Sequence, residues 1–379
     1  MPASPAPRRF LAHAASEDDG PAPVRRGRPF AVFVALAALI TGGLWWFLRA
    51  HEVAGDADAG ASQPSTGRLV YTAGRPGDQQ LWIWDPPAAG ATPGPALDAE
   101  VEQLVGAQGG LAGVLGVTTR DDEGLLTASV LRTQAAGARA ERVATAELVS
   151  WGPSGASVVS ANLGQARSGC YADVTMIRAR LDRGVRDQVF HRRGLCGQIS
   201  GLGQTFASTY FTWERDDGTG VFTVSDREPD VVLRGWSLLA ASPTSDLIVE
   251  PVAGPAGGSG AAVFRRGTEG PDPYRSDAGG PVGVRRILAW TTEADAALVE
   301  ATADGRDGLY LLDTRPGGDR VPVYVGLAQT PAFATATFDG SLYIAQQGNL
   351  LIWRDGHLSD AGLPSDAPRP TGPLAWLPG

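Results

Sequence analysis

A short element recurs along the chain and consists of an apolar strand that ends in a tight turn. Its copies read LVSWGPSG from Leu148, LAASPTS from Leu239, LAWTTEA from Leu288 and LAWLPG from Leu374. A second apolar run follows each copy except the last, as in SVVSA from Ser157. Leu239 and Leu288 lie 49 residues apart, which is close to the roughly 40 to 50 residues of a four-stranded propeller blade. The repeat therefore predicts an architecture built from similar β units.

The chain from Gly67 onward has the pattern of an all-β domain. Short runs rich in Val, Leu, Ile, Thr, Tyr and Trp alternate with clusters of Gly, Pro, Asp and Ser. Almost no stretch shows the three-and-four spacing of an amphipathic helix. Some runs end in an aspartate, as in LWIWD at 81–85 and LYLLD at 309–313. Residues 67–379 are therefore predicted to form one all-β domain.

This succession of strand, turn, strand and Asp-terminated strand resembles the TolB-like and WD-repeat β-propellers. The most complete copy runs from Leu288 to Asp313, although Thr-Glu-Ala-Asp replaces the Pro-Asp-Gly of the usual turn. The resemblance covers roughly residues 67–379 and implies a single propeller of about seven four-stranded blades, with six or eight also compatible. The expected blades span 67–105, 108–146, 147–200, 201–236, 237–285, 286–330 and 331–362.

The two ends of this domain complement each other. The segment with Leu374 and Trp376 resembles the first strand of a blade, yet no residues follow to build the other strands. Residues 68–85 supply later strands without an obvious first one. We therefore expect the ends to share a blade and close the ring, which protects strand edges. Trp151, Trp290 and Trp376 stand at equivalent strand ends, and we expect them to pack between blades rather than to stack on a ligand.

Cys170 and Cys196 are the two cysteines of the chain. They flank a stretch that reads as two strands with a turn near 182–184, which would bring the sulfur atoms side by side. A cysteine pair outside the cytoplasm is usually a disulfide, and closing this loop stabilises a fold by roughly 3 to 4 kcal/mol on the chain-entropy model. A redox pair, the alternative, usually has Cys-x-x-Cys spacing. The spacing here predicts a structural disulfide.

An uncharged run at 30–48, FAVFVALAALITGGLWWFL, nearly reaches the about twenty residues of a transmembrane helix. Five arginines precede it, so the positive-inside rule makes 1–29 a disordered cytoplasmic tail and places the bulk outside. Trp45 and Trp46 are expected at the outer membrane interface, and 49–66 reads as a linker. A cleaved signal peptide, the alternative, has a shorter apolar core and a nearby cleavage site. We therefore predict one signal-anchor span.

Composition and spacing predict a protein that is not an enzyme and has no catalytic, cofactor or metal site. The net charge is −9 and every basic residue is arginine, which disfavours nucleic acid as a partner and excludes lysine nucleophiles and phosphate loops. Acidic clusters at 121–123, 216–217 and 304–307 are flanked by glycine and indicate hairpin turns rather than the carboxylate pair of a glycosidase. The histidines lack zinc-type spacing, and they are His13, His51, His191 and His357.

These features lead us to expect a protein-binding or scaffold module of the bacterial cell envelope, held in the cytoplasmic membrane by a single span. The arginine-only, Ala- and Gly-rich composition is typical of a GC-rich bacterial genome, and the resemblance to TolB-like propellers implies protein contacts in the envelope. The expected partner is another envelope protein or a cell-wall polymer. Two alternatives are an extracytoplasmic hydrolase or lyase acting on glycans or peptides, and a ligand sensor that signals through the tail. Acidic, His and Arg side chains converging at the channel mouth would favour the enzyme.

The membrane topology can be tested directly with protease added to intact spheroplasts. Because the arginines precede the apolar run, the domain after it should be outside and should be digested. Immunoblotting against the carboxy-terminal region measures its loss. Survival of that domain until the cells are lysed would reverse the predicted orientation.

Overall fold

The computed structural model describes residues 67–379 except 88–89, 108–110, 112, 134–139, 225–228, 245, 253–259, 292 and 294. The predicted tail, the span with Trp45 and Trp46, and the linker lie outside the described residues. Those residues form strands and turns, and none of their segments is a helix that could cross a membrane. The described contacts belong to a single unit, Pro64–Gly379.

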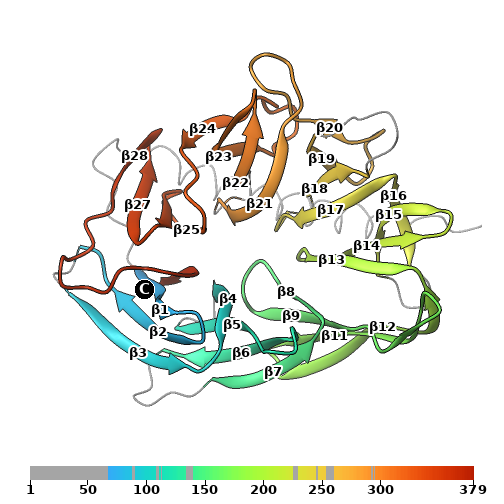
Figure 1. The fold of residues 1–379 in the computed structure, drawn as a ribbon, viewed down its shortest axis with the longest axis horizontal. Coiled ribbons are helices and arrows are strands. Elements are labelled where there is room, and N and C mark those ends of the chain that lie inside the picture. The colour runs from blue at the N-terminus through green and yellow to red at the C-terminus, as the bar shows by residue number, and fades with distance from the viewer. Residues whose placement is uncertain are drawn as a thin grey trace, which may run out of the picture. The chain divides into compact units, whose positions relative to one another are not determined.

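Seven antiparallel sheets hold the described strands, and each sheet is one blade of a propeller. Figure 1 shows them arranged around a common centre. Strands are given from the inner to the outer edge. Blade 1 comprises β29 (Leu374–Pro378), β1 (Gly67–Arg75), β2 (Asp78–Trp84) and β3 (Ala91–Leu97), and blade 2 comprises β4 (Glu100–Gly106), β5 (Val114–Arg120), β6 (Leu126–Arg132) and β7 (Glu141–Ala146).

Blade 3 is the exception among the described sheets because it has a fifth strand. It comprises β8 (Leu148–Trp151), β9 (Ser157–Asn162), β11 (Cys170–Arg180) and β12 (Val185–Cys196), with the short β10 (Ala166–Arg167) beside β11. Blade 4 comprises β13 (Gln198–Gln204), β14 (Thr209–Arg215), β15 (Gly218–Thr223) and β16 (Asp230–Arg234).

The last three blades have four strands each. Blade 5 comprises β17 (Trp236–Ala241), β18 (Asp246–Pro251), β19 (Ala262–Arg265) and β20 (Asp272–Pro273). Blade 6 comprises β21 (Gly283–Trp290), β22 (Ala296–Ala303), β23 (Arg306–Asp313) and β24 (Val323–Gly326). Blade 7 comprises β25 (Ala332–Ala336), β26 (Leu342–Gln346), β27 (Asn349–Arg354) and β28 (His357–Asp360).

The core is divided among the interfaces between blades. Each apolar cluster of the described residues joins two neighbouring blades, including one that joins blades 7 and 1. In β22, Leu298 packs toward blade 7, and the next residue, Val299, packs toward blade 5. Successive side chains of a strand point to opposite faces, so both faces of this strand are buried. This is why the second strand of a blade reads as a continuous apolar run.

Tight hairpins connect the strands within a blade. Asp304-Gly305 joins β22 to β23, and Asp355-Gly356 joins β27 to β28. All four residues have positive φ values, between 50° and 78°, which matches the two-residue hairpin favoured by Asp-Gly. The predicted turn at 304–307 is therefore confirmed.

The ring is closed by pairing its last strand with its first. β29 is antiparallel to β1, with Gly67 opposite Pro378 and Tyr71 opposite Leu374. The ring of Trp376 stacks on Tyr343 of blade 7 at 5.7 Å, and a Cβ at Gly67 would lie only 2.4 Å from that indole. The structure thus has the shared blade expected around Leu374 and Trp376.

The predicted division into blades needs one correction. β4 was assigned to the first blade, within 67–105, but it is the inner strand of blade 2. The inner place of blade 1 is already filled by β29, so only three strands of blade 1 come from the start of the domain. The other predicted boundaries fall within a few residues of the observed sheets, and the predicted number of seven is confirmed.

The predicted disulfide between Cys170 and Cys196 is confirmed, and it links opposite residues of β11 and β12. This end of the long hairpin is fastened to blade 4. The indole of Trp213 donates a hydrogen bond to the carbonyl of Cys196 at 2.9 Å, and Gly197 N–H donates to the carbonyl of Gly169 at 2.8 Å. The disulfide therefore secures a hairpin that also packs against the next blade.

Deleting residues 374–379 should destabilise the domain far more than trimming a surface tail would. Leu374, Trp376 and Leu377 are buried, and burying a large apolar side chain stabilises a fold by about 1.5 to 3 kcal/mol. We expect the melting temperature to fall by about 10 °C or more, or the domain to aggregate through its open strand edge. A chain lacking only Gly379 is the matched control. Equal melting of both truncated proteins would contradict closure by β29.

Candidate functional site

The inner strands of the seven blades line a channel along the axis of the ring. These strands run in the same sense, so their early residues lie at one end of the channel and their late residues at the other. Cavities of about 300, 290 and 310 Å³ overlap along this wall. The two ends of the channel carry different side chains and therefore favour different ligands.

One end, which we name the aromatic mouth, is formed by Trp151, Pro153, Phe206, Pro243 and Trp290. Phe206 is 67% exposed. Glu293 is the one charged residue among the described residues that line this end. An exposed phenyl ring beside prolines and a cavity is the kind of apolar surface that marks an interaction site.

A rigid turn holds Phe206 in this exposed position. Thr205 precedes it, and the Thr205 hydroxyl accepts hydrogen bonds from the backbone N–H groups of Ala207 at 3.2 Å and Ser208 at 3.0 Å. Such hydroxyl-to-backbone bonds are typical of turns initiated by Ser or Thr. The N–H of Phe206 also approaches the carbonyl of Pro243 of blade 5 at 3.5 Å. The side chain is thus presented by a fixed backbone.

The three tryptophans at the ends of inner strands pack between blades, as predicted. The ring of Trp151 covers Gly116 of blade 2, where a Cβ would lie 2.8 Å away, and its N–H donates to the Thr118 hydroxyl at 2.8 Å. Trp290 packs against the cluster shared by blades 5 and 6. Trp376 stacks on blade 7, as described above. All three line the channel cavity, and Trp151 and Trp376 are nevertheless buried.

The opposite end, which we name the arginine mouth, is formed by Glu102, Arg120, Arg286, Phe333 and Pro373. Arg120 Nε lies 2.5 Å from Glu102 Oε1. Arg286 lies over the ring of Phe333, with its guanidinium carbon 5.3 Å from the ring centroid. The arginine mouth therefore presents charged, hydrogen-bonding side chains, whereas the aromatic mouth presents mainly apolar ones.

The structure keeps the other candidate chemical groups apart. His191 lies on the outer hairpin of blade 3, where its Nε2 is 2.6 Å from Asp173 Oδ1, and His357 begins the outer strand of blade 7. The Asp121 carboxylate accepts backbone N–H bonds from Glu123 and Leu125, so the predicted turn at 121–123 is confirmed. Within the described residues no His, Cys, Asp or Glu side chains are grouped to hold a metal ion.

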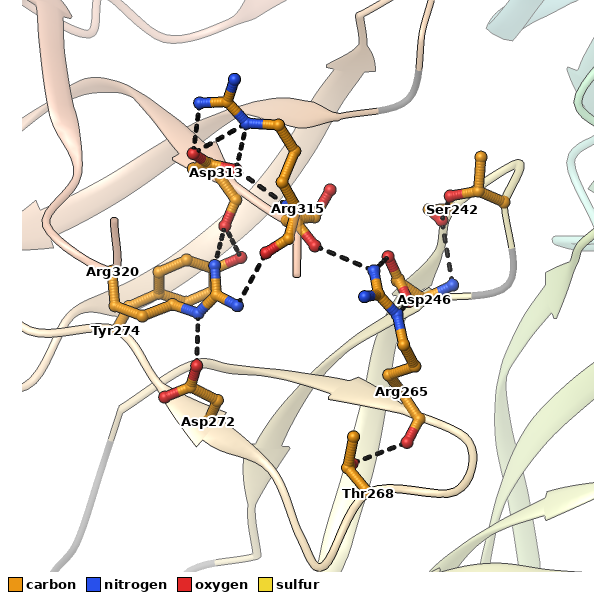
Figure 2. Close-up of polar contacts among 11 residues, drawn as sticks. Ser242, Asp246, Arg265, Thr268, Asp272, Tyr274, Asp313, Arg315 and Arg320 are labelled. Carbon is orange, nitrogen blue, oxygen red and sulfur yellow. Dashed lines mark hydrogen bonds and ion pairs between the residues drawn. The ribbon is translucent and has the colours of Figure 1, made fainter. Parts of the chain in front are cut away.

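A buried polar network lies between blades 5 and 6, away from the channel residues. Figure 2 shows its centre, the ion pair between Asp246 and Arg265. Arg265 Nε donates to Asp246 Oδ1 at 2.7 Å, and Arg265 Nη2 donates to Asp246 Oδ2 and to the Thr314 carbonyl at 3.3 Å. The Asp246 side chain is only 4% exposed. Hydrogen bonding to Asp246 raises the pKa of Arg265.

The same network continues to the outer side of blade 6. Arg320 donates to the Asp313 carbonyl at 2.9 Å and to Asp272 at 2.7 Å, and the Tyr274 hydroxyl donates to the Asp313 carbonyl at 3.0 Å. Burial raises the pKa of Tyr274. Burial also acts to raise the pKa of Asp313, but hydrogen bonds from Arg315 lower it below its usual value. Because these groups bind one another, the network joins two blades and is not a candidate ligand site.

Comparison with known proteins supports the fold. No protein-family model matches the chain, and no curated protein matches it. The β-propeller domain of the Trilobed protease from Pyrococcus furiosus, described as having an open velcro topology, is 9% identical with a TM-score of 0.54, covering 80% of this chain and 96% of that one. A putative 6-phosphogluconolactonase from Bacteroides uniformis is 12% identical with a TM-score of 0.50, covering 83% and 100%.

TolB from Acinetobacter baumannii is also a structural neighbour, at 11% identity and a TM-score of 0.43, covering 83% of this chain and 67% of that one. At such identities the similarity establishes the fold alone. The seven sheets, together with the two propellers at TM-scores of 0.54 and 0.50, identify the chain as a seven-bladed β-propeller.

Replacing Arg265 by Met should destabilise the domain without affecting the channel. Asp246 would then remain buried without its partner, which costs about 3 kcal/mol in comparable buried pairs. Urea unfolding measures the change, and Arg266→Met, at the exposed neighbouring position, is the control. Adding Asp246→Asn to Arg265→Met should recover part of the loss. Equal stability of Arg265→Met and Arg266→Met would show that the pair contributes little.

Proposed function

We propose that this chain is a membrane-anchored, extracytoplasmic propeller of the bacterial cell envelope that binds another envelope protein at its aromatic mouth. The observation that carries the proposal is the exposed Phe206, held by a rigid turn at the edge of a cavity. A preformed apolar anchor loses little conformational entropy on binding, so most of its contact energy contributes to affinity. Aromatic side chains of this kind are enriched in protein interfaces.

The chemistry of the channel also supports binding rather than hydrolysis. Among the described residues that line the channel, the carboxylates are those of Glu102 at the arginine mouth and Glu293 at the aromatic mouth, and that of Glu102 is engaged by Arg120. A glycosidase needs two carboxyl groups facing the scissile bond across a gap of about 5 to 10 Å. A carboxylate that is neutralised by a guanidinium group is poorly suited to that role, and Glu102 and Glu293 lie at opposite ends of the channel. The channel wall between the mouths is composed largely of Leu, Ala, Val and Gln side chains.

Site-specific photocrosslinking in native membranes tests this proposal. A photoreactive phenylalanine analogue at Phe206 should give one crosslinked protein of defined mass. Leu327 is the matched control position, because it is also apolar and 61% exposed but lies outside the residues that line the aromatic mouth. Equal crosslinking at both positions, or crosslinking at Phe206 to wall polymer alone, would contradict a protein partner at this mouth.

Once the crosslinked partner is identified, its affinity should depend on the phenyl ring. Phe206→Ser should weaken binding at least about tenfold, because truncating a central aromatic anchor typically costs 2 kcal/mol or more. Leu327→Ser should leave the affinity unchanged. Calorimetric titration of the full-length chain with the partner measures both. Thermal melting should be unchanged, since Phe206 is exposed.

A further inference from the structure

The arginine mouth continues into a second cavity through a shared aromatic residue. Phe333 lines both the arginine mouth and an adjoining cavity of about 370 Å³. We name this cavity the strap pocket because one wall is formed by Pro370 and Thr371, in the connection from β28 to β29. The residues that line it are Pro331, Phe333, Ala345, Gln346, Gln347, Gly348, Pro370 and Thr371.

The wall of the strap pocket is fastened to blade 1. The Thr371 hydroxyl donates to the carbonyl of Gly74 at 2.7 Å, and Thr371 N–H donates to the carbonyl of Thr72 at 2.9 Å. The N–H of Thr72 in turn donates to the carbonyl of Pro373 at 3.2 Å. The pocket is therefore preformed, and most of its lining is apolar.

The guanidinium of Arg286 lines the arginine mouth and lies over Phe333, the residue that both cavities share. Its Nη2 donates to Glu300 Oε1 at 3.3 Å and to the carbonyl of Ala332, and the Phe333 ring lies beneath it. The Glu300 side chain is 9% exposed, whereas that of Arg286 is 42% exposed. Among the described residues the hydrogen bonds of Arg286 use Nη2, so the N–H groups of Nε and Nη1 can donate to a ligand. The buried carboxylate of Glu300 therefore orients the guanidinium of Arg286 and leaves it partly exposed.

Each cavity has a further donor, Arg120 in the arginine mouth and Gln346 in the strap pocket. Arg120 uses Nε for Glu102 and Nη1 for the carbonyl of Gly124 at 3.0 Å, which leaves Nη2. Gln346, only 6% exposed, accepts the backbone N–H of Gln329 through its oxygen at 3.1 Å. Its amide NH₂ can therefore donate to a carbonyl in the strap pocket. Guanidinium and amide donors beside an apolar pocket match a carboxylate, a peptide carbonyl and an apolar side chain.

We propose that the arginine mouth and the strap pocket together bind the carboxy-terminus of a polypeptide that ends in an apolar residue. The terminal carboxylate is bound by Arg286 and Arg120, since guanidinium N–H groups match the geometry of a carboxylate. The last side chain occupies the strap pocket against Phe333. A polyanionic polymer fits less well, because the described lining of the strap pocket includes Pro331, Ala345 and Pro370 and contains no basic side chain.

Peptide binding to the full-length chain tests this proposal. The probes are a fluorescein-labelled Gly-Gly-Ala-Ala-Leu with a free carboxyl group and the same peptide as its carboxamide. Fluorescence polarisation should show at least about tenfold tighter binding of the acid, which is the effect of one charge-assisted hydrogen-bonding pair. Equal binding of acid and amide, no binding of either, or tighter binding of polyglucuronate would overturn the proposal.

Variants test whether Arg286 and Arg120 cause the preference for the peptide acid over the carboxamide. Arg286→Gln should abolish the difference between acid and amide, and Arg286→Gln with Glu300→Gln should do the same while avoiding an unpaired buried carboxylate. Arg120→Gln should reduce the difference. Arg354→Gln is the control, because Arg354 is 51% exposed and pairs with Asp339 outside both cavities. An unchanged preference in a folded Arg286→Gln, Glu300→Gln protein would contradict the assignment. Because the aromatic mouth is not altered, this result is independent of the protein-binding proposal.

Discussion

The closed ring of this propeller depends on the antiparallel pairing of β29 with β1. The pairing gives blade 1 its inner strand and places Trp376 against Tyr343 of blade 7. Without it, the apolar cluster that joins blades 7 and 1 would lose Leu374 and Trp376, and the channel would lose part of its wall. The connection before β29 also carries Pro370 and Thr371 of the strap pocket. Closure of the ring and construction of the strap pocket are thus one event.

The architecture could be predicted from the sequence because the second strand of a blade is buried on both faces and therefore reads as a continuous apolar run. The disulfide was also predictable, since Cys170 and Cys196 lie symmetrically about one turn. The assignment of β4 to the wrong blade has a physical reason: its residues, EVEQLVG, suit an outer strand as well as an inner one. Only the pairing of strands far apart in the chain decides between these positions.

Most of the candidate sites could not be predicted from the sequence. Phe206 is one phenylalanine among eleven, and only the bonds of Thr205 to the following backbone show that it points outward. Arg286 and Phe333 are far apart in the chain and meet because blades 6 and 7 are neighbours. The periodicity of strands can be seen in a single sequence, whereas these sites depend on which blades are neighbours in the ring. The Asp246–Arg265 pair was missed for another reason: it depends on the register of β18 and β19 within blade 5, which places the two residues opposite each other.

The pairing of Gly67 with Pro378 has a consequence for how the domain forms. Polypeptides emerge from the amino-terminal end, and their domains begin to fold before synthesis is finished. β1 must therefore wait, with one edge unpaired, until nearly the whole domain has emerged. Such an edge is a template for pairing with other chains, and contacts between distant residues form slowly. The last strand to appear thus controls how long the newly made domain is open to aggregation.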